Sequence, residues 1–310
     1  MKKLLLLILL TGSIPLTAQI VTDREVSEVQ GRVYTEEEEE VIKEVEEMEA
    51  TYSIDRTIHD ATTIGMGLYK MQDTYLSPNS YTGHGFRLTN ERMRITSQWT
   101  DKVSRQQLIN VDIATCKNPA ETADFLSAFV DYSLGYHLRM EPSYNFKILA
   151  GASLHGLFGG IYSTRNGNNP ASAKCEIDLN FSAMMIYSLY IKEYPITLRY
   201  QLELPCLGVM FAPGMGQSYY EIFTVGNYDG VVQFTTFSNK FVMKNLVTAD
   251  FPVGKSMLRV SYLNHTYDSN VNEVEFNIRS NTLMIGFVRE FAVIGNKNVR
   301  KRDYYRSPYY

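Results

Sequence analysis

Long runs of strictly alternating apolar and polar residues constrain this sequence more than any other feature. In LSAFVDYSLGYHLRM, residues 126–140, every even position is apolar and most odd positions are polar or small. A period of two predicts a β-strand whose two faces meet different surroundings. The segments 146–162, 175–192 and 194–206 repeat this pattern. The sequence therefore predicts a sheet with one oily face and one polar face.

A change of parity locates one of the turns. The apolar positions are odd up to Ile191 and even from Tyr194 onward. A two-residue hairpin at Lys192 and Glu193 requires this change, because the residues that flank such a turn pair and point to the same side. The predicted pairs are Ile191 with Tyr194, Leu189 with Ile196, and Tyr187 with Leu198.

The expected breaks between strands alternate between short and longer segments along residues 57–294. They fall at 76–83, 100–103, 117–123, 141–145, 164–172, 192–193, 211–236, 252–255 and 268–272. Short turns on one side, longer loops on the other and an even number of strands are typical of outer-membrane barrels. The sequence thus predicts an all-β fold, a transmembrane antiparallel up-and-down β-barrel of ten strands. Residues 218–237 would raise the number to twelve if they added a hairpin, and a ribbon outside the membrane is the alternative for this segment.

Alternation alone does not say which face points outward, since a secreted lipocalin-like barrel also alternates. Segments of about 15 residues favour a membrane, because about 10 tilted residues cross a bilayer and strands of soluble proteins are typically 5 or 6 residues long. The chain also has 22 tyrosines, many of them on the apolar faces, as expected for interfacial girdles. We therefore expect outer-membrane lipid to cover the apolar face.

The N-terminus has the features of an export signal. Lys2 and Lys3 precede the apolar run 4–10, and small residues follow up to Ala18. This arrangement predicts that residues 1–18 are a signal peptide cleaved after Ala18. The apolar run is shorter than the roughly 20 residues of a spanning helix. The mature protein is thus expected in the cell outer membrane.

Two charged segments flank the predicted barrel. Residues 19–56 include TEEEEEVIKEVEEMEA (35–50), which predicts an acidic helix with a narrow apolar stripe, and residues 295–310 form a basic tail. An even strand count places both termini in the periplasm. Association of the helix with the tail is one hypothesis, and two independent solvated segments are the alternative.

Charge and cysteine content exclude several classes of function. A net charge of −4 gives no support for nucleic acid as a partner. The three cysteines are widely spaced and follow no metal-binding or disulfide-framework pattern. No cofactor, metal site or catalytic residue is assigned from the sequence.

Charged residues of both signs lie at the positions that should face the barrel interior. Because a ten-stranded barrel is only slightly wider than one that side chains fill, ion pairs are expected to plug it. A narrow channel for small solutes remains an alternative. The candidate interior cluster is Asp131, His137, Arg139, Lys147, Glu176, Asp178, Arg199 and Glu203, and Gln201, Glu275 and Arg279 are also expected to face inward.

An outer-membrane hydrolase is the other alternative. Phospholipase-like barrels carry a serine two positions after a histidine, and no histidine of this chain is followed by serine at that spacing. Ser153 and His155 share the polar face, where a filled interior explains them better than a catalytic pair. An omptin-like protease would use acidic residues at the outer rim, where Asp112 and Asp268 are candidates, although no motif places them together.

The run ELPCLGVMFAPGMGQSYYEIF, residues 203–223, together with the AQ-type end of the signal and the chain length, resembles an uncharacterised family of exported proteins from Gram-negative gut anaerobes. That family is a domain of unknown function, numbered 3316. The resemblance implies an outer-membrane-type barrel without an assigned activity. Insertion of such a barrel would involve the barrel-assembly machinery as a partner, and MIGFVREF, residues 284–291, is a candidate internal assembly signal.

Overall fold

The computed structural model describes residues 58–96, 102–143, 145–191, 194–253 and 256–291. The predicted signal peptide, acidic helix and basic tail lie outside these residues. The strands are β1 (Ile58–Asp73), β2 (Ser77–Ile95), β3 (Val103–Lys117), β4 (Asp124–Ser143), β5 (Phe146–Ser163), β6 (Ala171–Ile191), β7 (Tyr194–Phe211), β8 (Val232–Thr236), β9 (Lys240–Val253), β10 (Ser256–Val271) and β11 (Val274–Phe291).

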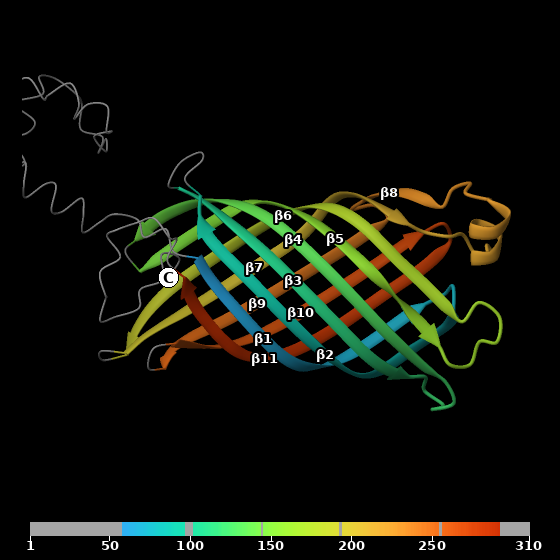
Figure 1. Cartoon of the computed structure of the whole chain (residues 1–310), viewed down its shortest axis with the longest axis horizontal. Helices are drawn as coiled ribbons and strands as arrows, with labels where there is room; N and C mark the ends of the chain where they lie inside the picture. Colours follow the sequence, from blue (N-terminus) through green and yellow to red (C-terminus); the bar gives the residue numbers. More distant parts are fainter. Residues whose placement is uncertain (1–57, 97–101, 144, 192–193, 254–255, 292–310) are drawn as a thin grey trace, which may run out of the picture. The chain divides into compact units, whose positions relative to one another are not determined.

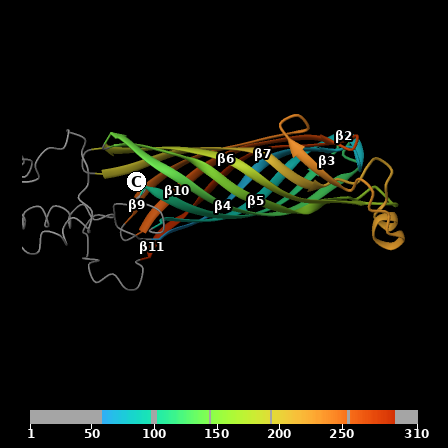
Figure 2. The same cartoon turned by 90° about the horizontal axis from the view of Figure 1, so that it is seen from above.

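The strands form one closed antiparallel barrel (Figures 1 and 2). Each long strand pairs with its neighbours in sequence, and β1 pairs with β11 from Ile58 opposite Phe291 to Asp73 opposite Phe276. The sequence-based prediction of an antiparallel up-and-down barrel is thereby confirmed. The predicted hairpin register is also confirmed, since Ile191 pairs with Tyr194 and Tyr187 with Leu198.

The barrel has ten strands rather than twelve, because β8 and β9 share one place in the ring. β8 pairs with β7 at Leu207–Phe211, and β9 pairs with β7 at Thr197–Glu203. Residues 237–239 form a short interruption between β8 and β9. Residues 218–237 therefore add no transmembrane hairpin, and instead contain a π-helical turn, η1 (Glu221–Val225), and β8.

The two ends of the barrel differ in their connections. We call the end where β1 begins and β11 ends the terminal end, and the opposite end the loop end. β4 is followed by β5, β6 by β7 and β9 by β10 at the terminal end, and the connections 118–123, 164–170 and 212–231 lie at the loop end. Short and longer connections are expected to alternate along the chain. The first and last loop-end connections, 74–76 and 272–273, are instead tight turns, because β1, β2, β10 and β11 extend to the end of the barrel.

The long connection 212–231 is fixed to the loop-end rim. The Tyr75 hydroxyl donates a hydrogen bond to the Gln217 carbonyl at 2.8 Å, and Asn272 donates to the carbonyls of Ala212 and Gly230. Burial, with Tyr219 nearby, raises the pKa of Tyr75 to about 12. Tyr75 therefore stays a neutral donor at physiological pH.

Among the described residues, no helix is long and apolar enough to cross a membrane.

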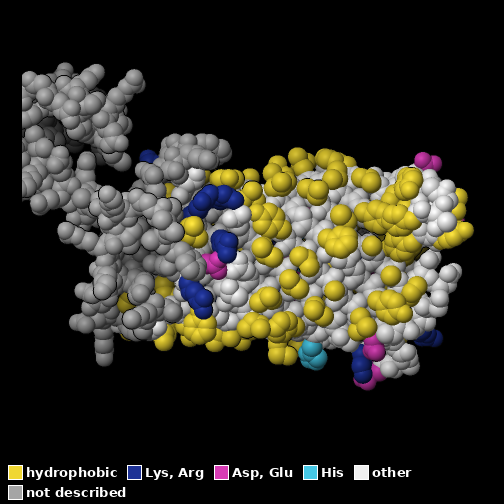
Figure 3. Space-filling model, in the orientation of Figure 1, with side chains coloured by type: hydrophobic (Ala, Val, Ile, Leu, Met, Phe, Trp, Pro, Cys, Tyr) yellow, Lys and Arg dark blue, Asp and Glu magenta, His cyan; other side chains and the backbone are white. Residues whose placement is uncertain are grey.

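The outer surface of the barrel is apolar along the middle of the strands (Figure 3). Met66 in β1 is 71% exposed and Phe158 in β5 is 69% exposed. Along β4, the even positions from Leu126 to Met140 face outward, and the odd positions from Phe125 to His137 are buried. Soluble proteins rarely expose so large an apolar area. The exterior is therefore suited to lipid and the polar face to the interior, which is the arrangement of transmembrane barrels.

Substitution of Met66 by arginine tests this assignment. Met66 lies at the middle of β1, where an arginine would meet hydrocarbon, so the substitution should lower the free energy of unfolding by about 2–4 kcal/mol. Gln72→Arg, an outward position near the end of the same strand, should cost about 0–1 kcal/mol. Urea unfolding in lipid vesicles measures both changes, and equal costs at the two positions would contradict a lipid-facing wall.

Candidate functional site

The barrel interior holds the largest group of buried charged residues in the described structure. These side chains come from nearly every strand, and some of them cross the lumen to the opposite strand, as Arg199 does to Glu91. We describe them in three layers from the terminal end to the loop end: a carboxylate–guanidinium layer around Glu91, a lysine–carboxylate layer around Asp178, and an aromatic layer around Phe125.

The first layer joins opposite walls of the barrel. Glu91 in β2 accepts hydrogen bonds from both terminal nitrogens of Arg199 in β7, at 2.7 and 2.8 Å. Arg259 in β10 also contacts Glu91 and binds Asp250 in β9 through two bonds of 2.7 Å. Planar guanidinium groups suit such two-point pairing with carboxylates. Glu91 is thereby paired with two cations, one from the opposite strand β7 and one from β10, beyond the β1–β11 seam.

Neutral side chains complete the first layer. Gln106 in β3 and Gln201 in β7 are 3.0 Å apart across the lumen, and Gln106 also donates to Glu91. Gln201 further donates to Glu203 at 2.9 Å. His137, fully buried on β4, lies inside the barrel at the same end. Each of these contacts places polar atoms where a solute would have to pass.

The second layer is built on two lysines from β9. Lys240 lies 2.8 Å from Glu176 and 2.7 Å from Asp178, both on β6. Lys244 lies 3.4 Å from Asp131 on β4 and 3.2 Å from His155 on β5. All of these groups are buried, so removal of one partner would leave an unpaired charge away from water.

Two tyrosines and an arginine extend this layer around the ring. Tyr267 in β10 donates to Glu176 at 2.7 Å, and Tyr69 in β1 donates to Asp112 in β3 at the same distance. Arg87 in β2 pairs with Asp112 at 2.7 Å. Tyr69 fits in this position because Gly85 on the neighbouring strand leaves room for its ring: a Cβ at Gly85 would lie 2.3 Å from a ring carbon.

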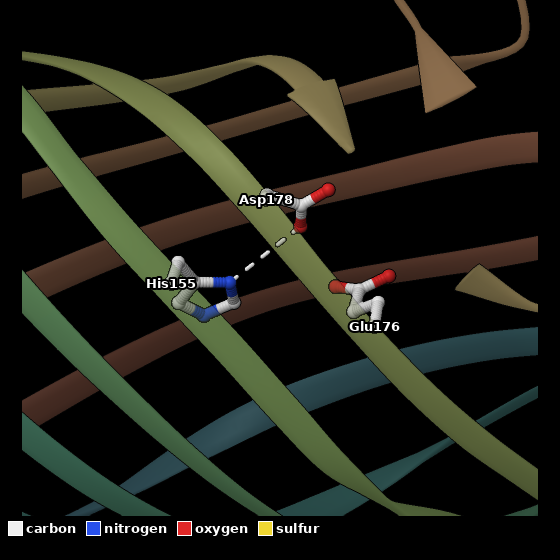
Figure 4. A group of neighbouring side chains, drawn as sticks. All are labelled: His155, Glu176 and Asp178. Atoms are coloured by element: carbon white, nitrogen blue, oxygen red, sulfur yellow. Dashed lines mark ion pairs between the residues drawn. The ribbon is translucent and has the colours of Figure 1, made fainter. Parts of the chain in front are cut away.

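His155, Glu176 and Asp178 offer ligand atoms that all lie within 4.8 Å of one another (Figure 4). Such a donor set suits a divalent cation. The Lys240 ammonium, however, lies between Glu176 and Asp178 within hydrogen-bond distance of both. The positive charge of Lys240 therefore takes the part that a cation would play, and a metal would first have to displace it.

The third layer, at the loop end, is aromatic. Tyr81 and Phe125 stack with ring centroids 3.6 Å apart, and Phe276 packs against Tyr267 and Phe129. The surrounding buried residues include Met71, Leu76, Ala114, Cys116, Ala123, Ile161, Val242 and Ile278. A void beside His155 and Tyr267 in the second layer measures only about 10 Å³, about the volume of one water. Side chains thus fill this part of the lumen.

Most of the sequence-predicted cluster lies inside the barrel. Asp131, Glu176 and Asp178 lie in the second layer, where each pairs with a lysine of β9. Arg199 and Glu203 lie in the first layer, where Arg199 pairs with Glu91 and Glu203 accepts from Gln201. Arg139 lies near the terminal end and pairs with Glu141 at 3.0 Å. Lys147 is half-buried close to the same end. The buried members of the cluster are Asp131, His137, Glu176, Asp178, Arg199 and Glu203.

Two expected inward residues face outward instead. Glu275 and Arg279 are exposed on β11, and Arg279 pairs with Asp268 at 2.9 Å outside the barrel. The inward positions beside them are the apolar Phe276 and Ile278. At the loop end the aromatic layer occupies the interior, and the outward positions of β11 beside it are polar or charged. The usual relation between polarity and side is therefore reversed there.

Sequence reasoning missed the central partners of the network. Arg87 and Glu91 are absent from the sequence-predicted cluster, although both are buried on the inner face of β2. Their common odd parity, continued by Thr89 and Met93, was the signal that could have revealed them. The other missed partners are Asp250, Arg259, Lys240 and Lys244, each on the buried side of β9 or β10.

The enzyme candidates do not come together in the described structure. Ser153 and His155 both face inward, yet His155 contacts Lys244, Asp131 and Asp178 rather than Ser153. Asp112 is held inside the barrel by Arg87, and Asp268 lies on the outside with Arg279. The barrel wall therefore separates the two aspartates.

A closed ten-stranded barrel with an oily exterior and an ion-paired interior defines a transmembrane-type β-barrel protein. The chain belongs to the family described as "Protein of unknown function (DUF3316)", which matches residues 3–298. No curated protein matches the sequence.

Several solved structures are similar to this chain. The outer membrane protease OmpT from Escherichia coli is 6% identical, with 76% of this chain and 97% of that chain covered and a TM-score of 0.41. The β domain of the Bordetella autotransporter BrkA is 11% identical, with coverage of 75% and 99% and a TM-score of 0.39. The COG4313 outer membrane channel from Pseudomonas putida F1 is 12% identical, with coverage of 76% and 96% and a TM-score of 0.32.

Replacement of Glu91 by glutamine tests the first layer. Glu91→Gln leaves Arg199 and Arg259 without their shared carboxylate, and breaking a buried ion pair typically costs about 3–5 kcal/mol. Glu203→Gln is the matched control, because Glu203 is also buried but accepts its hydrogen bond from the neutral Gln201 amide. This control should cost about 1 kcal/mol. Urea unfolding in vesicles compares the two variants, and equal costs would mean that the paired charges add nothing.

Proposed function

We propose that this protein is a plugged β-barrel of the cell outer membrane that acts as a non-enzymatic surface or structural protein. The observation that carries the proposal is the contact between Glu91 and Arg199, which crosses the lumen between opposite strands. Cross-lumen ion pairs and aromatic packing leave no wide aqueous path through the described part of the barrel. The chemistry of the interior is therefore that of a folded core.

The proposed orientation follows from the strand number. An even count leaves both termini on one side, which is the periplasm in outer-membrane barrels. We propose that the terminal end faces the periplasm after removal of residues 1–18, and that the barrel-assembly machinery inserts the protein. The loop end, with the long connection 212–231, then faces the cell exterior. The exposed side chains of this connection include Met215, Tyr220, Phe223, Val225 and Tyr228.

Ion conductance distinguishes a plug from a channel. The purified protein, refolded in detergent and added to planar lipid bilayers, should insert without producing conductance steps in concentrated potassium chloride. A wide porin treated in the same way is the positive control. Regular steps from the wild-type protein would contradict the plugged interior and favour the narrow-channel alternative.

Surface labelling tests the orientation. A short epitope inserted between Asn227 and Tyr228, in the exposed part of the long connection, should bind antibody on intact cells. The same epitope placed after Tyr310 should bind antibody only after the outer membrane has been permeabilised. Labelling of the C-terminal epitope on intact cells would reverse the proposed orientation.

A further inference from the structure

Arginines gather on the outer surface of the barrel close to its terminal end. Arg92 and Arg94 lie on β2, Arg105 on β3 and Arg289 on β11, all at outward positions. Asp60 on β1 pairs in register with both Arg92 and Arg289. Figure 3 shows basic side chains at this end of the wall, next to the band of hydrophobic side chains. The patch has four positive charges against one negative charge.

Arg94 and Arg105 have no counter-charge among the described residues. Arg94 and Arg105 are directly opposite each other on neighbouring strands, an arrangement that destabilises a sheet when both side chains carry the same charge. Within the described part of the chain, neither residue has an ion-pair partner. The Nε atom of Arg105 is buried and has no hydrogen-bond acceptor. An anion with several oxygen atoms placed between the two guanidinium groups would remove both penalties.

The wall has room for such an anion. A cavity of about 430 Å³ opens at this position and is lined by Arg92, Arg94, Arg105 and Gln107, among others. Asp60, which also borders it, is already paired with Arg92 and accepts a hydrogen bond from Asn90 at 2.8 Å. The free positive charge at the cavity therefore belongs to Arg94 and Arg105.

The depth of the patch identifies the source of the anion. Four residues from Arg92, Arg105 and Arg289 toward the middle of the barrel lie the exposed apolar residues Leu88, Ile109 and Ile285. Four residues span about 13 Å of strand, or about 10 Å of depth at a tilt of about 40°. The arginines thus lie at the edge of the apolar belt. This is the level of lipid headgroups, where basic side chains meet phosphate.

We propose that Arg94 and Arg105 bind the phosphate group of an anionic phospholipid, with Arg92 at the edge of the site and the acyl chains lying along Leu88 and Ile109. The proposal rests on the proposed membrane location of the barrel. An anionic headgroup fits better than a zwitterionic one, because the patch carries an excess of positive charge that a headgroup ammonium would oppose. A free phosphate ion would leave the adjacent apolar wall uncovered.

Binding of defined lipids tests the site. The full protein in neutral detergent is titrated with phosphatidylglycerol, phosphatidylcholine or inorganic phosphate, and native mass spectrometry measures the bound fraction. The temperature at which the barrel loses its heat-modifiable gel mobility measures stabilisation. We expect phosphatidylglycerol to bind and stabilise the wild-type protein more strongly than the other two. In the R94Q/R105Q variant its affinity should fall about tenfold, as expected for the loss of charge-assisted hydrogen bonds.

The matched control is K70Q/R279Q. Lys70 and Arg279 are also outward cations directly opposite each other, but at the loop end, where Asp268 pairs with Arg279. This variant should bind phosphatidylglycerol as the wild-type protein does. Equal losses in both variants would overturn the proposal, as would equal stabilisation of the wild-type protein by phosphatidylcholine or by inorganic phosphate. The wild-type comparison decides the question even if R94Q/R105Q does not fold. A protein that stays monodisperse without detergent would instead refute the membrane location.

Discussion

Glu91 on β2 lies between the guanidinium group of Arg199, from β7 on the far side of the ring, and that of Arg259, from β10 beyond the β1–β11 seam. Other buried charges of the interior are also paired between strands. A charge that is removed from water must be paired, or its desolvation outweighs what the fold gains. Pairing across the lumen therefore fixes the distance between opposite walls of the barrel. It also fixes which residues of the paired strands lie at the same height along the barrel axis. The same requirement explains why Lys240 and Lys244 each meet carboxylates from other strands.

The side chains that fill the interior change in type along the barrel axis. Ion pairs occupy the part of the lumen that lies behind the oily belt, and aromatic rings occupy the loop end. The rings there share the interior with the buried Lys174–Asp73 ion pair, whose ammonium lies 4.2 Å from the centroid of the Phe276 ring. The exterior of the same strands carries polar residues such as Glu275. The carboxylates of the candidate cation site at His155 are also paired within the chain, because Lys240 supplies the positive charge. In the described part of the barrel, most buried carboxylates are thus paired with cations of the same chain.

Much of the architecture could be predicted from the sequence, because a period of two records which side of a strand meets lipid. The hairpin after Ile191 and the ten-stranded ring were accessible for this reason. The network partners were less accessible: alternation places Glu91 on a face but does not say which strand lies opposite. Where the loop-end interior is apolar, as at Phe276, the rule that polar residues point inward gave the wrong side for Glu275 and Arg279. The interruption between β8 and β9 depends on pairing with β7, which a local pattern does not encode.

The seam between β1 and β11 joins the first and last strands of the barrel along their whole lengths. Its partners are far apart in the chain, so bringing them together has a large entropic cost that only the finished ring repays. Glu91 and Arg259 come from the strands next to this seam, on either side of it. Their charges consequently stay hydrated until the ring closes. Exclusion of water from the lumen is then a late event in folding. Once water is excluded, reopening the ring would expose these ion pairs again, so ring closure is hard to reverse.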